Sequence, residues 1–309
     1  MIFYRWLTLS FSLLLLFSPG AVSAKNSTGE IIAYKQVLEI STHLQLPSDV
    51  AVDGKGYIYV LDGTVNLVRV YDKKGIPLFT LGGDKMLSQP LGIDVSPAGD
   101  VLVADSGNHR LAYFALGQTT PQYLDLPSPP DGKPADPTDV CFAVDNRTFL
   151  AVDNDNHRIL ALDHSGAILW SRGGMGRNPG EFRFPFMMDQ DEAGNIYVVE
   201  VINTRVQVLD AKGNFSQFIG EWGIEPGQLY RPKGVAVNDS NEVFVSDSYL
   251  GVIQIFDREG RLTGIVGDEN GKLRKFSTPV GMTSSDSRLF VVEMFKNRIT
   301  VLQRQKSEN

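Results

Sequence analysis

Four aspartates recur near the starts of successive repeats of this chain and could carry chemistry: Asp49, Asp94, Asp139 and Asp189. Carboxylate oxygens are the ligands that Ca²⁺ prefers, and Zn²⁺ accepts them as well. Asp94 and Asp189 occupy equivalent places in two inner strands, and Asp49 and Asp139 lie at a rim. Two interpretations stay open: carboxylates solvated in a central channel of the fold, which need no cofactor, or a site for calcium or zinc.

Other patterns that could carry catalysis are weaker. The four histidines are His43, His109, His157 and His164. His109 and His157 belong to a repeated turn motif, and the other two lie before the first repeat and in an outer turn. Convergence on one metal ion is therefore not expected. The sequence has no Gly-x-Ser-x-Gly nucleophile motif and no phosphate-binding glycine loop before a helix. No catalytic residue is assigned.

A six-fold repeat positions these residues. Each unit has a proline, an alternating apolar strand, a Gly- or Asn-centred turn, and a second strand that ends in an acid. The prolines are Pro47, Pro90, Pro137, Pro185, Pro232 and Pro279, and the acids are Asp62, Asp105, Asp153, Glu200, Asp247 and Glu293. The steps between successive acids are 43, 48, 47, 47 and 46 residues, which is the length of a four-stranded propeller blade.

The period-two alternation and the absence of a helical stripe after residue 24 predict an all-β chain. We expect residues 25–305 to form a six-bladed β-propeller of four-stranded antiparallel blades, with 306–309 as a C-terminal tail. The last unit is one strand short, because the chain ends soon after Leu302. Residues 31–40 can supply that strand and so close the ring, which removes an exposed sheet edge.

Residues 1–24 have the pattern of a signal peptide. Arg5 precedes an apolar run over residues 7–17, and Val22-Ser23-Ala24 offers a cleavage site. The run is shorter than the roughly 20 residues that span a bilayer. We therefore expect a periplasmic or extracellular protein with no stable membrane insertion after cleavage. The formal net charge of −7, without a Lys/Arg run, argues against a nucleic-acid partner. The single cysteine, Cys141, permits no internal disulfide.

The turns Asp105-Ser-Gly-Asn-His-Arg110 and Asp153-Asn-Asp-Asn-His-Arg158 resemble NHL repeats, and the linkers Gly180-Glu-Phe182 and Gly227-Gln-Leu229 resemble the blade junctions of that family. The resemblance covers nearly all of residues 25–305 and implies a six-bladed propeller. It departs from the pattern in blade one, where Leu67 stands at the Arg position, and in blade five. We expect the repeated acids to pair with the Asn and Arg of their own turns as part of the fold.

In such a blade, the start of strand one, the turn after strand two and the inter-blade linker lie on one side of the disc, here called the junction face. Aromatic and cationic residues are frequent in protein interfaces. The binding candidates on this face are Phe182, Phe186, Trp222, Tyr230, Arg231 and Lys233. They favour an exported NHL-repeat propeller that binds a protein or peptide, or serves as a scaffold. The alternative is a propeller enzyme, a lyase or lactone hydrolase, with a divalent cation at its central channel; a similar six-bladed zinc lyase amidates peptides.

Overall fold

The computed structural model describes residues 29–305, and the signal-peptide prediction lies outside this range. The described chain is all-β. Four of its sheets each hold four antiparallel strands in chain order. Their strands are β2 (Asp49–Val52), β3 (Ile58–Asp62), β4 (Leu67–Tyr71) and β5 (Pro77–Gly82); β6 (Ile93–Val95), β7 (Val101–Asp105), β8 (Arg110–Phe114) and β9 (Gln122–Asp125); β10 (Pro137–Phe142), β11 (Thr148–Asp153), β12 (Arg158–Asp163) and β13 (Ile168–Gly173); and β14 (Pro185–Gln190), β15 (Ile196–Glu200), β16 (Arg205–Leu209) and β17 (Phe215–Ile219).

The fifth sheet has eight strands in the order β18-β19-β20-β21-β1-β24-β23-β22. These strands are β1 (Ile31–Ile40), β18 (Pro232–Val237), β19 (Val243–Asp247), β20 (Val252–Phe256), β21 (Leu262–Gly267), β22 (Pro279–Ser285), β23 (Arg288–Glu293) and β24 (Arg298–Arg304). The sheet consists of two four-stranded halves joined through β1. Residues 31–33 of β1 run parallel to β21, and residues 34–40 run antiparallel to β24.

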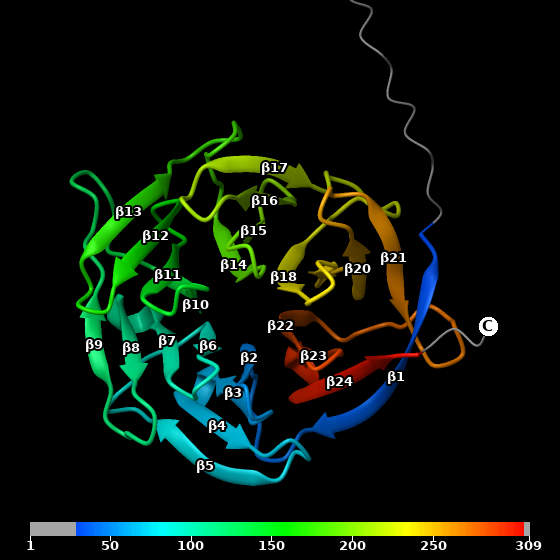
Figure 1. The fold of residues 1–309 in the computed structure, drawn as a ribbon, viewed down its shortest axis with the longest axis horizontal. Helices are drawn as coiled ribbons and strands as arrows, with labels where there is room; N and C mark the ends of the chain where they lie inside the picture. The colour runs from blue at the N-terminus through cyan, green and yellow to red at the C-terminus, as the bar shows by residue number, and fades with distance from the viewer. Residues whose placement is uncertain (1–28, 306–309) are drawn as a thin grey trace, which may run out of the picture.

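The N-terminal strand thus pairs with the last C-terminal strand, as the sequence predicts. The structure has five hydrogen-bonded sheets where six separate ones were expected, because the short parallel pairing of β1 with β21 joins the last two units. The innermost strands β2, β6, β10, β14, β18 and β22 contact one another in that order, and β22 also contacts β2. Figure 1 shows the sheets arranged around a common centre. The first strand of each four-stranded sheet lies nearest the centre, and the fourth lies at the outer edge.

The core lies between neighbouring sheets, because each strand directs alternate apolar side chains to its two faces. One cluster joins Leu61 of β3 to Val103 of β7. An equivalent cluster joins Val60 of β3 to Val292 of β23, and Ile40 of β1 packs into it. The first and last units are therefore packed against each other like their neighbours in sequence. Within residues 29–305, no helix is long and apolar enough to cross a membrane.

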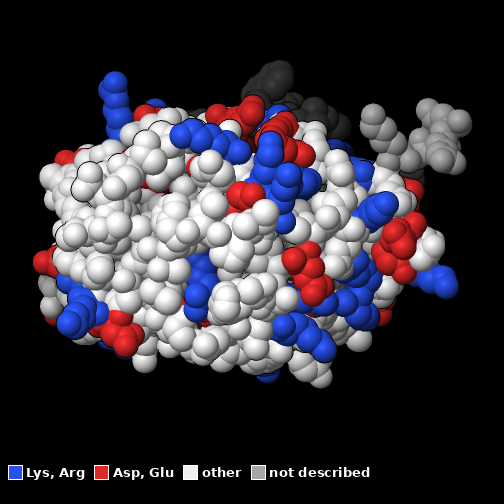
Figure 2. Space-filling model, turned by 90° about the horizontal axis from the view of Figure 1, so that it is seen from below, with Lys and Arg blue, Asp and Glu red and all other residues white. Residues whose placement is uncertain are grey.

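The outer edge of the ring of sheets, here called the rim, is unevenly charged. Figure 2 views the rim from below Figure 1 and shows a largely uncharged surface over its left part, where β5 and β9 lie. Ile76, Leu78, Phe79 and Leu116 are exposed in this region. A groove of about 300 Å³ runs between Phe79 and Leu116. Lys, Arg, Asp and Glu side chains gather at the right, on the side of β1 and β24.

Candidate functional site: the channel and the junction face

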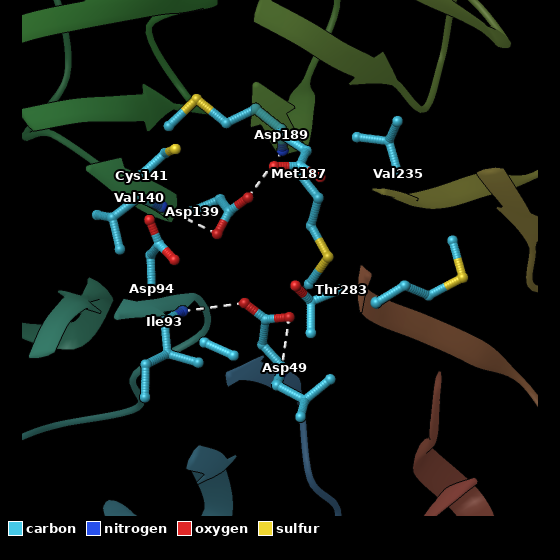
Figure 3. Close-up of a pocket in the computed structure, with 14 residues that line it drawn as sticks. Asp49, Ile93, Asp94, Asp139, Val140, Cys141, Met187, Asp189, Val235 and Thr283 are labelled. Atoms are coloured by element: carbon cyan, nitrogen blue, oxygen red, sulfur yellow. Dashed lines mark hydrogen bonds between the residues drawn. The ribbon is translucent and has the colours of Figure 1, made fainter. Parts of the chain in front are cut away.

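The four predicted aspartates meet at the central channel. Figure 3 shows Asp49, Asp94, Asp139 and Asp189 directed from four inner strands toward one space, with Val235 and Thr283 on the opposite side. The remaining lining residues are Val50, Ala51, Ile93, Val140, Cys141, Met187, Met188 and Met282. The space between these side chains is about 30 Å³, which is room for water or a single ion but not for an organic ligand.

Each of these carboxylates joins two neighbouring units. One oxygen of Asp49 accepts a hydrogen bond from the backbone N–H of Val50 at 2.8 Å, and the other accepts from Ile93 of the next unit at 2.9 Å. Asp94, Asp139 and Asp189 repeat this arrangement. They accept from the following residue and from Phe142, Met188 and Val237, respectively. Asp49 and Asp139 lie two residues after their prolines and Asp94 and Asp189 lie four after theirs, so the bridges form two alternating levels.

Burial raises the pKa of all four carboxyls. The pKa of Asp94 rises to about 6, that of Asp189 to about 7 and that of Asp49 to about 8, and the pKa of Asp139 lies well above its ordinary value. Loss of hydration is the largest cause in each, and the backbone N–H donors oppose it. The interpretation as solvated carboxylates is therefore wrong for Asp49 and Asp139, which are 5% and 4% exposed.

The backbone hydrogen bonds to the four aspartates also weigh against the interpretation as a metal site. Among residues 29–305, no three His, Cys, Asp or Glu side chains are placed to hold a metal ion together. Each of the four carboxylates already accepts two backbone hydrogen bonds in separate inter-unit bridges. Cys141 is buried beside them, and burial raises the pKa of its thiol well above the ordinary value. The channel geometry therefore suits inter-blade bridging better than cation binding.

The repeated strand-ending acids are structural, as predicted. Asp105 and Asp153 are fully buried, and each pairs with the Nε of its own Arg, Arg110 at 2.8 Å and Arg158 at 2.7 Å. Each also accepts a backbone N–H from the linker that precedes its unit. The acid of the fifth unit, Asp247, has no Arg and accepts four backbone N–H groups instead.

The repeated histidines have backbone roles. His109 and His157 follow the turn with φ of 57° and 54°, in the left-handed region. The Nδ1 of His109 lies 2.7 Å from the carbonyl oxygen of Ala135, and the Nδ1 of His157 accepts the N–H of Phe184 at 3.2 Å. Each imidazole therefore ties its unit to the linker of the next. No histidine is among the residues that line the channel space.

Most of the predicted binding residues lie together on the junction face. The Nζ of Lys233 is 4.0 Å from the ring centroid of Phe186. The ring of Tyr230 packs on Tyr249, with centroids 4.9 Å apart, and the guanidinium of Arg231 lies 5.8 Å from the centroid of Tyr249. Tyr249 belongs to the turn after β19 and was not predicted, because that turn departs from the repeat motif.

Phe182 is a correction to the sequence prediction. Its side chain is 0% exposed and packs in the core between the third and fourth units, so it cannot contact a ligand. The linkers fold back on themselves through the parallel bridges Met175↔Phe182 and Trp222↔Leu229. This buries Phe182 and Leu229 and exposes Met175 and Trp222. Trp222 is 69% exposed, consistent with its predicted place on the surface.

An open groove of about 650 Å³ lies beside Trp222. It runs between the two linkers and the turn after β15, and its lining includes Arg177, Ile202, Phe218 and Trp222. Buried Gln207 fixes the first linker, because its side chain accepts from the N–H of Gly180 and donates to the carbonyl of Glu181. Gln254 fixes the second linker through Gly227 and Gln228 in the same way. Gln207 and Gln254 stand one repeat apart in the sequence, and this match is the signal that distinguishes them from other polar residues of the strands.

Comparisons with known proteins agree with this architecture. The family model described as NHL repeat matches residues 87–114. The fold is similar to a structure described as streptogramin B lyase, at 18% identity and TM-score 0.61, covering 83% of this chain and 78% of that one. It is similar to virginiamycin B lyase from Staphylococcus aureus, at 17% identity and TM-score 0.60, covering 83% and 80%.

It is also similar to Kuenenia stuttgartiensis hydrazine synthase, at 11% identity and TM-score 0.61, covering 87% of this chain and 98% of that one. These identities are low, so the likenesses show a shared fold and not a shared activity. No curated protein matches the chain by sequence. The repeated four-stranded antiparallel sheets and the similar structures together show a β-propeller fold, and residues 87–114 of it match the NHL repeat.

Proposed function

We propose that the chain is an exported six-bladed propeller that binds a protein or peptide on its junction face. The observation that carries the proposal is the concentration of exposed large apolar side chains there. They include Met175, Ile202, Trp222, Ile224, Tyr249 and Phe295, all more than half exposed. Exposed aromatic and apolar groups beside a preformed groove are typical of interaction surfaces.

Six blades fit the pattern of contacts. If the eight-stranded sheet is counted as two blades joined at β1, every unit has four strands and the inner strands complete a ring. A closed ring holds the linkers of neighbouring blades in fixed positions. A rigid surface of this kind loses little conformational entropy when a ligand binds.

Export rests on the leader sequence. If residues 1–24 are a signal peptide, the mature protein begins at or near Lys25 and is recovered in the periplasm or medium. Intact-mass measurement of the protein from its native cells tests this. Membrane-bound protein that retains residues 1–24 would contradict it.

The enzyme alternative depends on a divalent cation in the channel. Three of the similar structures are named lyases, and one of these is an inactive variant with a histidine replaced by alanine. In this chain four blades contribute carboxylates to the channel, which favours a cation, but those carboxylates are engaged by backbone N–H groups. Metal analysis of the purified protein, with and without chelation, decides between the binding protein and the enzyme. One tightly bound ion per chain, together with lyase or hydrolase turnover lost on chelation, would establish the enzyme.

Binding is tested with matched surface variants. Immobilised mature protein captures partners from native cell envelope and medium, and quantitative mass spectrometry compares the wild type with Ile202→Ser/Trp222→Ala. The control is Ile76→Ser/Leu116→Ala, which changes two apolar residues at the rim that are also more than half exposed. The proposal expects a reproducible partner that is lost with the first variant only, after chelation as well as before. Loss of the partner with the rim variant alone would place the binding site at the rim and not on the junction face.

A further inference from the structure

Two cations on the junction face have no acidic partner. Arg231 directly precedes Pro232, the first residue of β18, and Lys233 follows it. Neither takes part in any ion pair within residues 29–305. In contrast, Arg110, Arg158 and the equivalent arginines of other units pair with the acid of their own blade. In an acidic protein, unpaired neighbouring cations are available to an anionic ligand.

The two cations are held in place. The backbone N–H groups of Tyr230 and Arg231 both donate to the buried carboxylate of Asp247, at 2.7 and 2.9 Å. Proline fixes the backbone φ between the two cations. Aromatic rings then confine the side chains, with Phe186 against Lys233 and Tyr249 beside Arg231. The positions of the charges are therefore set before a ligand arrives, which reduces the entropy lost on binding.

The surroundings favour an incoming anion. Partial burial, and next the charge of Arg231, lower the pKa of Lys233. The charge of Lys233 is thus partly dehydrated and lies close to a like charge. An anion that contacts both side chains would relieve the repulsion and replace the lost hydration.

The chemistry points to a carboxylate next to an aromatic or aliphatic group. A guanidinium binds a carboxylate through two parallel hydrogen bonds, and the three rings beside the cations offer apolar contact area. A long polyanion is less suitable, because the protein carries a formal net charge of −7 that repels it.

We infer that Arg231 and Lys233 bind a side-chain or terminal carboxylate of an acidic peptide segment, with an adjacent apolar residue packed on Phe186, Tyr230 and Tyr249. The inference rests on the proposed peptide-binding function and deepens it by naming the class of peptide. It predicts selectivity for Asp or Glu beside an aromatic or aliphatic residue, and binding that weakens with salt.

Selection from a random peptide display library on the full mature chain tests this. The variants are Arg231→Gln and Lys233→Gln, singly and together, with Lys233→Arg as the conservative variant. The matched control is Arg147→Gln with Lys73→Gln, two exposed cations outside the ion pairs of the described chain. Melting temperatures verify that each variant is folded.

We expect the wild type and the control to enrich peptides with Asp or Glu beside an apolar residue. Replacing Glu by Gln in an enriched peptide, or removing one cation, should weaken binding about tenfold or more, because a hydrogen bond to a charged group contributes on the order of 1.5–3 kcal/mol. Lys233→Arg should retain most of the affinity.

The outcomes separate the two proposals. Enriched peptides without an acidic preference, or an acidic preference unchanged in the double variant, would overturn this inference and leave peptide binding standing. If no peptide is enriched above a blocked-surface control, the proposed function itself fails. Binding of a single-stranded oligonucleotide that depends on Arg231 and Lys233, without peptide binding, would assign the site to a nucleic acid and overturn both.

Discussion

Each buried carboxylate at the channel serves a single bridge between blades, and its protonation affects the fold. In the folded state the carboxyls of Asp49 and Asp189 have pKa values near 8 and 7, against about 4 in an unfolded chain. The folded state therefore holds these protons more tightly than the unfolded state does. The stability that this provides is lost as pH rises from the unfolded value through the folded pKa.

We accordingly expect the melting temperature to fall as pH rises from about 4 to about 8. His157, whose pKa burial lowers below the ordinary value, has the opposite effect but only below about pH 6.5, so the fall is steepest above that pH. Asp49→Asn should flatten the slope, because it removes one titrating group. Asp163→Asn, at an exposed carboxyl whose pKa is lowered by Ser165, should leave the slope unchanged. Thermal unfolding across the window measures this, and a wild-type melting temperature that rises with pH would contradict the assignment.

The blade ion pairs give a second prediction. The side chain of Arg158 is 11% exposed and that of its partner Asp153 is 0% exposed. Arg158→Ala would leave a buried charge without its partner, so we expect a loss of roughly 3–5 kcal/mol in the free energy of unfolding. Arg261→Ala removes an exposed pair and should cost at most about 1 kcal/mol. Urea denaturation compares the two. A folded Arg158→Ala protein that has lost only ligand binding would show that Arg158 belongs to the binding site.

The sequence predicts these ion pairs in the blades where the repeat motif is complete. It did not predict the ion pair of the first blade, where the motif is incomplete. The first blade has Leu67 at the expected Arg position, but the Nε of Arg69 contacts Asp62 at 2.9 Å. Residues two apart in a strand point to the same face, so the guanidinium reaches the same carboxylate from one step farther along β4. The channel aspartates were identified as a set. Their partners were not, because bridges between blades depend on how the blades pack.

At the level of the element, the N-terminal strand is the best test of how the sheet edges are satisfied. β1 lies between β21 and β24 and pairs with both. The need for such a strand followed from counting, since the last unit had only three. Its parallel pairing with β21 did not follow, because that contact depends on where the ring brings the fifth unit.

Deleting residues 29–40 should expose the edges of β21 and β24 together with the apolar cluster around Ile299 and Val301. We expect aggregation or loss of a cooperative unfolding transition. Trimming residues 306–309 is the control and should change the melting temperature little. Size-exclusion chromatography with thermal unfolding compares the two truncations, and equal stability would contradict a role for β1 in closure.

The linkers show that a sequence pattern can predict the shape of an element without predicting which of its side chains are buried. Their sequences match, and the structure gives them the same hairpin-like shape held by Gln207 and Gln254. The pattern did not reveal which aromatic residue points inward. Phe182 takes the inward position of its linker, as Leu229 does in the next one, whereas Trp222 takes the outward position. This difference depends on how the linker folds back on itself.

For the whole molecule, the packing at the seam between the last and first units can be compared with the packing at the other junctions. Two glycines allow a direct comparison. A Cβ on Gly92 would lie 2.4 Å from Oδ1 of Asp139, at a junction inside the ring, and a Cβ on Gly281 would lie 2.2 Å from Oδ1 of Asp49, at the seam. In both cases backbone atoms of the facing unit are also closer than 3.0 Å, so the crowding cannot be relieved by a side-chain rotation.

We expect Gly92→Ala and Gly281→Ala to destabilise the protein by similar amounts, on the order of 1–3 kcal/mol each, through overpacking. Combining Gly281→Ala with Asp49→Ala should recover little stability, because the Cα of Asp49 and the carbonyl of Ser48 remain in the way. Urea denaturation of the two single variants and the double variant gives the comparison. If Gly281→Ala is tolerated while Gly92→Ala is not, the seam is looser than the other junctions, and β1 alone would hold the first and last blades together.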